Sequence, residues 1–328
     1  MNKEKVSVVM CTYNGEKYLK EQIDSIINQT YPIYEIIIQD DCSTDHTMDI
    51  LRNYEKEYSN MHVFRNEIRK GINENFFSAM ARATGDYIAL SDQDDIWEPD
   101  KIEAQINSIG EKWLSCGFSK LFSFDKEIYF DKRIPNFNIE RLIYVNTSAA
   151  GHSMLLNKEM LAYIPQKTTI IYDHVILITA ASNNMISFLD RILVKHREHE
   201  NSATYTIPIM KRGDNNKGFI NIVNSLFRTL KQYIKLRDSI HTYFSEINAL
   251  LKELPDWEVK KTALKISQYQ SEKGFLPYVK LTYYCLKSRK YLFYTKEKEG
   301  ILTCLRAIYF PISCSDYFRY MLKKRVLR

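Results

Sequence analysis

Short apolar runs alternate with amphipathic segments along the first part of the chain. The runs at 6–10 (Val-Ser-Val-Val-Met) and 35–39 (Glu-Ile-Ile-Ile-Gln) predict buried strands. Apolar residues recur every three or four positions over 19–27, which predicts a helix after the first strand. The same succession continues with a second helix around 50–54, a strand at 61–65, a helix at 73–83 and a strand at 87–90. Strands that alternate with helices indicate an α/β fold with a mostly parallel sheet.

The pattern from residue 100 to about 200 is less regular. It predicts one helix through Ile102 and Trp113, strands at 121–124 and 153–156, a helix at 172–181 and two separate strands at 186–189 and 192–195. Beyond Pro208 the apolar spacing becomes helical throughout. We therefore expect an α/β catalytic domain over 1–208 and a helical region over 209–328.

Charge divides the chain near the same position. Residues 1–210 hold 22 Lys and Arg against 30 Asp and Glu, whereas 211–328 hold 24 against 10, giving net charges of −8 and +14. Many aromatic residues accompany the positive charge, and residues 319–328 form a basic amphipathic end. This mixture suits an anionic membrane surface, with a solvated helical bundle as the alternative. No nucleic-acid-binding motif accompanies the charge, so nucleic acid is not an expected partner.

Composition excludes several other classes of protein. Hydrophobic residues make up 45% of the chain, with only 10 Gly and 8 Pro, which excludes collagen-like and disordered chains. No apolar run approaches the ~18 residues that span a bilayer, and no apolar leader follows Met1. The six cysteines form no C-x-x-C motif, as is usual in a reducing compartment. We expect a cytoplasmic protein, peripheral at the inner face of the membrane.

Three polar loops follow predicted strands, and in a parallel sheet such loops meet at one edge. The loop at 91–95 (Ser-Asp-Gln-Asp-Asp) holds three carboxylates, whose mutual repulsion favours a bound cation. Carboxylate oxygens with substrate phosphates are the ligands that Mg²⁺ or Mn²⁺ prefers. The alternative is a solvated turn that caps the next helix. At the end of a central strand, we favour a metal-diphosphate site.

The loops after the first two strands offer groups that could bind a nucleotide. In the loop at 40–45, Asp45 or Thr44 is expected to cap a helix, which leaves Asp40 and Asp41 to accept hydrogen bonds. The earlier loop offers the hydroxyl of Thr12, the ring of Tyr13 and the amide of Asn14. It holds one glycine, too few for a phosphate-cradling P-loop.

These three loops, in this order and at this spacing, resemble the motifs of the family 2 glycosyltransferases. The match runs from 8–14 through 39–45 to 91–101 and covers roughly residues 5–205. The Asp-Gln-Asp-Asp-Ile-Trp form is similar to a bacterial branch that assembles cell-surface polysaccharides and is called rhamnosyltransferase-like. The resemblance implies the GT-A fold and a nucleoside-diphosphate sugar donor.

The family motifs imply roles for individual residues. Thr12 and Asp41 would contact the nucleobase, and Asp40 would hold the loop. Tyr13 and Asn14 would lie beside them in the nucleotide site. Asn75 would make a further contact with the nucleotide, and Asp92 would contact the ribose and diphosphate. Asp94 would bind the cation. Cys42 stands where the family usually has glycine, which argues against a left-handed backbone there.

Two later segments resemble the rest of the family's site. Asp173, at the start of a predicted helix, matches the catalytic base; read alone, it is more typical of a helix cap. Arg197 and His199 match a basic segment that contacts the diphosphate, and His199 would complete the metal site. His196 and His199 by themselves are a weak zinc signal, and a solvated charged turn is the favoured alternative.

We therefore expect an inverting, Mg²⁺- or Mn²⁺-dependent transferase that moves a sugar from a UDP- or dTDP-linked donor to a growing, lipid-linked surface glycan. Two alternatives remain. One is a sugar-phosphate nucleotidyltransferase, which would need a glycine-rich basic first loop that this chain lacks. The other is a non-catalytic sugar-nucleotide-binding protein.

Overall fold

The computed structural model describes residues 3–122, 132–144, 149–165, 167–199, 219–293 and 300–313. The chain forms two compact units. The first comprises Met1–Pro135, Ala149–Ala180 and Asn184–His199, and the second comprises Asn136–Ser148, Ala181–Asn183 and Glu200–Arg328. The predicted boundary at 208/209 and the basic end at 319–328 lie outside the described residues.

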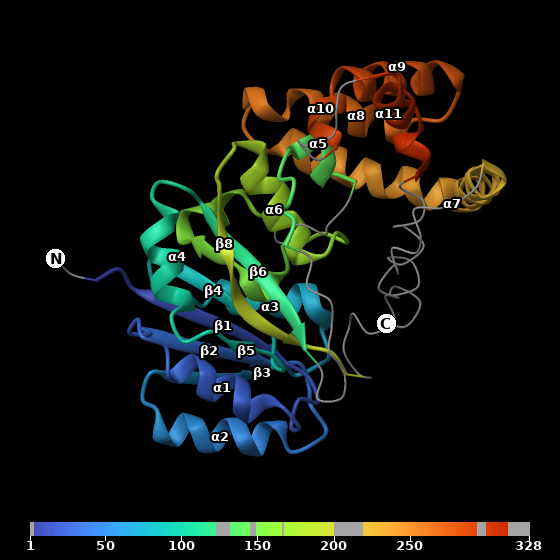
Figure 1. Cartoon of the computed structure of the whole chain (residues 1–328). Coiled ribbons are helices and arrows are strands. Elements are labelled where there is room, and N and C mark those ends of the chain that lie inside the picture. The colour runs from blue at the N-terminus through green and yellow to red at the C-terminus, as the bar shows by residue number, and fades with distance from the viewer. Residues whose placement is uncertain are drawn as a thin grey trace. The chain divides into compact units, whose positions relative to one another are not determined.

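The first unit is built on one sheet with the strand order β3-β2-β1-β4-β7-β6-β8-β5 (Figure 1). Its strands are β1 (Val6–Thr12), β2 (Glu35–Asp40), β3 (Met61–Arg65), β4 (Tyr87–Ser91), β5 (Ile96–Trp97), β6 (Leu114–Phe122), β7 (Leu155–Asn157) and β8 (Ile186–Arg197). The first four strands are parallel, and so are β6 and β8, whereas β7 runs antiparallel to β4 and β6, and β5 runs antiparallel to β8. The carboxyl ends of β1, β2, β4, β6 and β8 therefore lie along the same edge.

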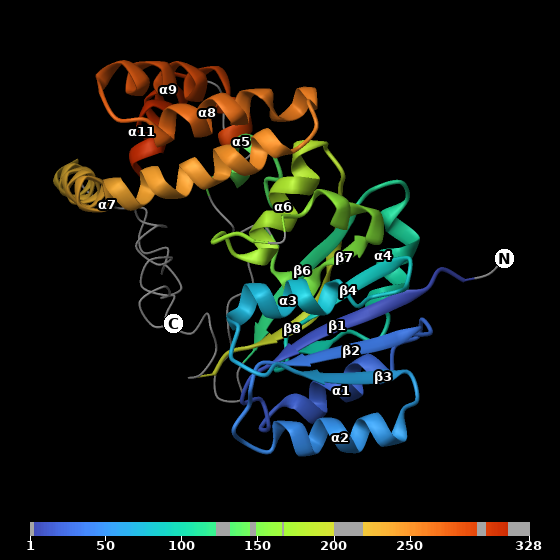
Figure 2. The same ribbon diagram turned by 180° about the vertical axis from the view of Figure 1, so that it is seen from behind.

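Helices cover both faces of this sheet. They are α1 (Leu19–Ile27), α2 (Thr47–Glu57), α3 (Gly71–Met80), α4 (Lys101–Ile109) and α6 (Tyr172–Ser182), with the short 3-10 helices η1 (Gly151–Ser153) and η2 (Lys158–Tyr163). Val8 and Met10 of β1 pack in one core cluster with residues of α1, α2 and α4. Helix α3 covers β1 and β2 on the other face, as Figure 2 shows. Burial on both faces explains the continuous apolar runs in β1 and β2.

The second unit is helical in the part of the chain that the structure describes. Its helices are α5 (Ile139–Leu142), α7 (Phe219–Glu253), η3 (Glu258–Lys260), α8 (Lys261–Ser271), α9 (Phe275–Lys287), α10 (Arg289–Leu292) and α11 (Ile301–Ser313). Tyr144 packs against the rings of Phe244 and Phe310, with centroids 4.8 Å away in both cases. Among the described helices, none combines the length and the apolar character that crossing a membrane requires.

The elements predicted before residue 100 are confirmed, and the later ones are partly wrong. The two strands expected at 186–189 and 192–195 are the single strand β8, in which Asp190 and Arg191 fall at a bulge opposite Gly117 and Phe118. Strand β6 begins at Leu114, well before the predicted 121, and β5 was not foreseen. Helix α4 ends at Ile109 because Gly110 has a positive φ of 51°. The polar residues Asp190 and Arg191 at the bulge in β8 resemble a turn in the sequence, which explains why two strands were predicted there.

Candidate active site

The loops that follow β1 and β2 are joined by hydrogen bonds. The Thr12 hydroxyl donates to Asp40 Oδ1 at 2.9 Å, and the Ser43 amide donates to Asp40 Oδ2 at 2.9 Å. Asn14 accepts from the Thr44 amide at 2.8 Å. Asp40 is fully buried, so its carboxylate holds the two loops together. Asp45 accepts from the Thr47 amide at 3.0 Å, which confirms its predicted place at the start of α2.

Asp41 connects β2 to the start of α3. Its Oδ1 accepts from Asn66 Nδ2 at 2.8 Å and from the Lys70 amide at 2.7 Å, and its Oδ2 accepts from the Gly71 amide at 2.8 Å. A carboxylate oxygen accepts about two hydrogen bonds, so Oδ2 can accept one more. Asn75 is buried, with its amide bonded to Asn66 and to the Gln39 carbonyl. A direct contact between Asn75 and a nucleotide stays a prediction.

The backbone at Cys42 corrects the sequence-based expectation. Cys42 has φ of 64°, inside the left-handed region that its side chain was expected to exclude. The tight bend lets Asp40 and Ser43 bond to each other, while Cys42 Sγ lies 3.2 Å from the Asn66 carbonyl oxygen. A non-glycine residue in this region costs roughly 1–2 kcal/mol. The surrounding hydrogen bonds hold the strained turn in place.

Gln93 links the first loop to the acidic loop after β4. Its side chain accepts from the Tyr13 amide at 2.9 Å and donates to the Tyr13 carbonyl at 3.1 Å. The Arg69 guanidinium covers the Tyr13 ring at 3.9 Å from the centroid. A Cβ at Gly15 would lie 2.3 Å from Gln93 Oε1, so a larger residue there would have to displace the Gln93 side chain. All three predicted polar loops therefore meet at the carboxyl edge of the sheet.

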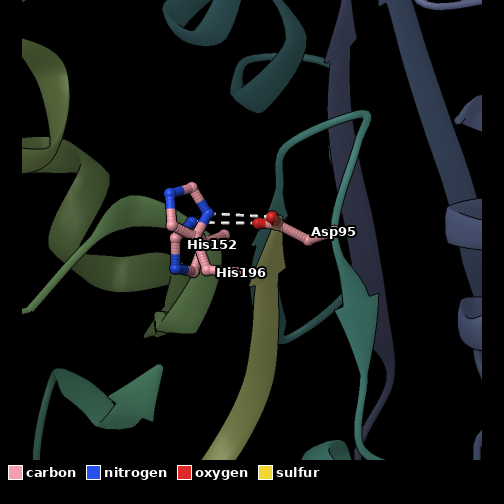
Figure 3. Close-up of side chains that lie close together, drawn as sticks. All are labelled: Asp95, His152 and His196. Carbon is pink, nitrogen blue, oxygen red and sulfur yellow. Dashed lines mark hydrogen bonds and ion pairs between the residues drawn. The ribbon is translucent and has the colours of Figure 1, made fainter. Parts of the chain in front are cut away.

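Each acidic side chain of the loop after β4 contacts a histidine. His152 Nδ1 donates to Asp92 Oδ2 at 3.0 Å and lies 3.1 Å from Asp95 Oδ2. His196 Nδ1 donates to the other oxygen of Asp95 at 2.8 Å, and the rings of the two histidines stack, as Figure 3 shows. Farther out, His199 Nε2 donates to Asp94 Oδ2 at 2.8 Å. For His196 and His199, a solvated turn was the favoured alternative to zinc binding, but their side chains are only 14% and 16% exposed.

Electrostatics make this loop a cluster of opposite charges. Burial alone would lower the pKa of His152, but the charges of Asp95 and Asp92 raise it to about 9, so the ring is cationic at neutral pH. Burial would raise the pKa of Asp95, but His152 and His196 lower it below the usual value. The pKa of Asp94 is raised by burial and by the neighbouring charges of Asp95 and Asp92. Asp94 is therefore the carboxylate with the greatest need of a further cation.

Two sets of side chains could hold a metal ion. The ligand atoms of Asp95, His152 and His196 lie within 4.8 Å of one another. Asp95 is fully buried and also accepts from the Arg197 amide at 3.0 Å, and a ligating histidine must be neutral. Because His152 is cationic and Asp95 already accepts these hydrogen bonds, we assign this cluster to support of the loop. Asp94 and His199 form the second set, with side chains that are 17% and 16% exposed, and carboxylate oxygen with imidazole nitrogen suits Mn²⁺.

Arg197, at the end of β8, is hydrogen-bonded to the backbone of the acidic loop after β4. Its guanidinium is 1% exposed, lies between the rings of Tyr18 and Phe122, and donates to the Asp94 carbonyl at 2.9 Å and to Glu21 at 2.7 Å. These contacts fix the backbone of Asp94. The structure thus gives Arg197 a positioning role, and its predicted direct contact with the donor stays a prediction.

Asp173 is the second residue of α6, next to the buried Tyr172. The Tyr172 ring stacks on Phe76 at 4.0 Å, and its hydroxyl lies where a Cβ at Gly151 would come within 2.2 Å. Burial, followed by the charges of Asp92 and Asp173, raises the pKa of Tyr172. Asp173 directly follows Tyr172 at the start of α6, and its role as the base stays a prediction.

Sequence reasoning missed several residues of this site. His152 and Tyr172 carry no motif of their own, and Gln93 and Asp95 were quoted within the acidic motif without a role. His196 was considered only as part of a weak zinc signal with His199, without a role at the acidic loop. The signal for Asp95 was its place in the carboxylate triplet, because three adjacent acids require some compensating charge.

Comparisons with known proteins identify a family and several similar relatives. A sequence model described as glycosyl transferase family 2 matches residues 7–184. TuaG of Bacillus subtilis (strain 168), which is named as a teichuronic acid biosynthesis glycosyltransferase, is 42% identical over 114 residues, covering 35% of this chain and 44% of TuaG. The chain thus spans less than half of that relative. The dTDP-rhamnosyl transferase RfbG of Shigella flexneri is 27% identical over 211 residues, covering 59% of this chain and 72% of RfbG.

Solved structures share the fold. S. aureus TarS 1-349 in complex with UDP-GlcNAc matches 96% of this chain and 91% of its own, with a TM-score of 0.57 and 16% identity. The mannosyltransferase PcManGT of Pyrobaculum calidifontis, in complex with GDP-Man and Mn²⁺, matches 99% and 87%, with a TM-score of 0.53 and 15% identity. These matches confirm the expected GT-A fold. Because the family model covers more than half of the chain and its three motifs meet at one edge of the sheet, the protein belongs to glycosyl transferase family 2.

Proposed function

We propose that the protein transfers a sugar, with inversion, from a UDP- or dTDP-linked donor to a growing, lipid-linked surface glycan. The observation that carries this proposal is the meeting of the loops after β1, β2 and β4 beside the Asp94–His199 pair. Family membership supports the reaction class. The named roles of TuaG in teichuronic acid biosynthesis and of RfbG as a dTDP-rhamnosyl transferase support the donor and the acceptor class.

The first two loops would bind the nucleotide. The remaining acceptor capacity of Asp41 Oδ2 suits an N–H of the base, and Thr12, Tyr13 and Asn14 lie in the adjoining loop. Asp92, which is 37% exposed, is the most accessible acid of the loop after β4 and suits a ribose hydroxyl. The hydrogen bonds of Gln93 to Tyr13 and of Asp40 to Thr12 fix the two loops before a donor binds, which lowers the entropy cost of binding.

Asp94 and His199 would hold the cation, which we propose to be Mg²⁺ or Mn²⁺. In the structure these two ligand atoms share a hydrogen bond of 2.8 Å, and an ion would bind both in its place once Nε2 has lost its proton. When bound, the ion neutralises the negative charge that develops on the departing diphosphate. Arg197 positions this pair, because its guanidinium donates a hydrogen bond to the Asp94 carbonyl.

Asp173 would act as the general base. An acceptor hydroxyl attacks C1 of the sugar from the face opposite the diphosphate, and its proton passes to the Asp173 carboxylate. As the new C1–O bond forms, the old one breaks, and its electron pair leaves with the nucleoside diphosphate. One displacement inverts the configuration at C1. General-base assistance contributes typically ~100- to 10,000-fold to such a rate.

The test is sugar-nucleotide turnover by the purified protein with Mn²⁺. We expect release of UDP or dTDP from at least one donor, and an Asp173→Asn variant should lose at least ~100-fold in turnover while its nucleotide affinity stays unchanged. Asp49→Asn serves as the matched control, because Asp49 is an exposed residue of α2. Nucleotide binding without turnover of any donor would instead indicate the non-catalytic alternative. Release of pyrophosphate from a nucleoside triphosphate and a sugar phosphate would indicate a nucleotidyltransferase.

A further inference from the structure

Two helices of the second unit each expose an apolar stripe. On α9 the stripe consists of Phe275, Leu276, Val279 and Tyr283, and on α11 it consists of Ile301, Leu302, Leu305 and Ile308. Phe275 and Ile301 are both 82% exposed, and Leu302 is 70% exposed. Such exposure of large apolar side chains, grouped rather than scattered, marks an interaction surface.

Helical geometry puts each stripe on one side of its helix. At 100° per residue, the four α9 positions fall within about 100° of the helix circumference, and the four α11 positions within about 120°. The opposite side of α9 holds the buried Leu281 and Cys285, and that of α11 holds the buried Ala307 and Phe310. Helix α9 packs against α11. Among the described residues, the sides of α9 and α11 that are buried are therefore opposite the stripes.

Positive charge accompanies both stripes. Within the described residues 274–293 and 300–313, the basic side chains are Lys280, Lys287, Arg289, Lys290 and Arg306, and there is no Asp or Glu. Lys280 and Lys287 follow Leu276 and Tyr283 by four positions, so they border the α9 stripe. Arg306 lies on the exposed side of α11, with its guanidinium 4.8 Å from the Phe293 ring centroid.

We propose that these stripes insert into the headgroup region of an anionic lipid surface. The argument is charge complementarity: helices α9 and α11 carry apolar and aromatic side chains with Lys and Arg and no Asp or Glu, which is the composition of interfacial helices. A second copy of the chain would bring like charges together at this surface, whereas an anionic leaflet attracts them. The inference deepens the proposed function by assigning the contact with the membrane on which a lipid-linked acceptor would lie.

The test is sedimentation of the full-length protein with vesicles of phosphatidylcholine, with and without phosphatidylglycerol. We expect binding only to vesicles that contain phosphatidylglycerol, and binding that weakens as salt rises. The double variant Phe275→Ser/Leu302→Ser, with one change on each helix, should bind at least about tenfold more weakly. Lys280→Gln/Lys287→Gln should lose about fivefold per charge at low salt.

Two controls match these variants. Ile134→Ser changes a side chain of the first unit that is 59% exposed, and Lys20→Gln/Lys56→Gln removes two exposed charges from α1 and α2. Both should bind vesicles as the unchanged protein does. Donor turnover, measured without vesicles, should be unaffected in every variant, so a failure of the docking proposal is distinguishable from a failure of the proposed reaction.

Three results would overturn the proposal. Equal sedimentation of the Phe275→Ser/Leu302→Ser variant and the unchanged protein would show that the stripes do not meet lipid. Equal binding to vesicles with and without phosphatidylglycerol would remove the role of charge. A change in oligomeric state of the apolar variant, without vesicle binding by the unchanged protein, would assign the stripes to contacts between copies of the chain.

Discussion

His152 Nδ1 lies 3.1 Å from Asp95 Oδ2, and the two side chains are 3% and 0% exposed. The pair joins η1 to the loop after β4, and the hydrogen bond that His152 Nδ1 donates to Asp92 Oδ2 extends the connection to the more accessible acid. A buried carboxylate without its cation is costly, so each member depends on the other. This pair fixes the loop that carries Asp94.

Replacing His152 by Asn should destabilise the protein by about 3 kcal/mol, the lower end of the range for breaking a buried pair. The loss stays at the lower end because His196 and the Arg197 amide continue to contact Asp95. Urea unfolding measures the change. His46→Asn is the matched control, since His46 pairs with Asp49 at a site that is 82% exposed, and it should leave the midpoint unchanged. An unchanged midpoint for His152→Asn would contradict the role assigned to the pair.

Stability should fall as pH rises from about 6.5 to about 9. The folded pKa of His152 is about 9, against about 6.5 for an unfolded histidine, so the folded state binds the proton more tightly. The contribution of His152 is complete below the unfolded value and is lost as pH rises through the folded value. Unfolding free energies measured across this window should decline in the unchanged protein. The decline should be smaller in His152→Asn, and parallel curves would contradict the prediction.

Gly15→Ala should cost about 1–3 kcal/mol and weaken nucleotide binding, because the new Cβ would displace the Gln93 side chain from Tyr13. Adding Gln93→Ala should remove most of the extra cost, so the double variant should be no less stable than Gln93→Ala alone. Thermal unfolding and nucleotide titration of the four proteins test this coupling. Gly300→Ala is the control, since a Cβ there has open space around it. Additive effects would show that the two residues act independently.

UDP or dTDP with Mn²⁺ should raise the melting temperature of the protein, and the increase should disappear with EDTA or with Asp94→Ala. The physical reason is that burial and the neighbouring charges of Asp95 and Asp92 raise the pKa of Asp94, so a divalent ion gains from the excess negative charge of this loop. A nucleoside diphosphate screen by thermal shift measures this. Stabilisation that survives both changes would remove Asp94 from the metal site.

Much of the first unit was predictable because its strands are short, apolar and separated by amphipathic helices. Parallel strands end at one edge, so the acids Asp40, Asp41, Asp92 and Asp94 could be expected to converge from their positions alone. The later strands were harder to predict from the sequence. Asp190 and Arg191 are polar bulge residues inside β8, and the two-residue strand β5 carries no period of its own. A local pattern cannot reveal pairing between strands that lie far apart in sequence.

The sequence by itself determined the fold class, the order of the early elements and the acids at the carboxyl edge, because these follow from hydrophobic period and strand direction. Only the tertiary structure decided what each acid contacts. His152 meets Asp95 from 57 positions later in the chain and His196 meets it from the end of β8, with no local signal for either contact. The physical reason is burial: a charge that is buried away from water needs a partner of opposite charge or a hydrogen bond. Which side chain becomes that partner depends on how the chain folds.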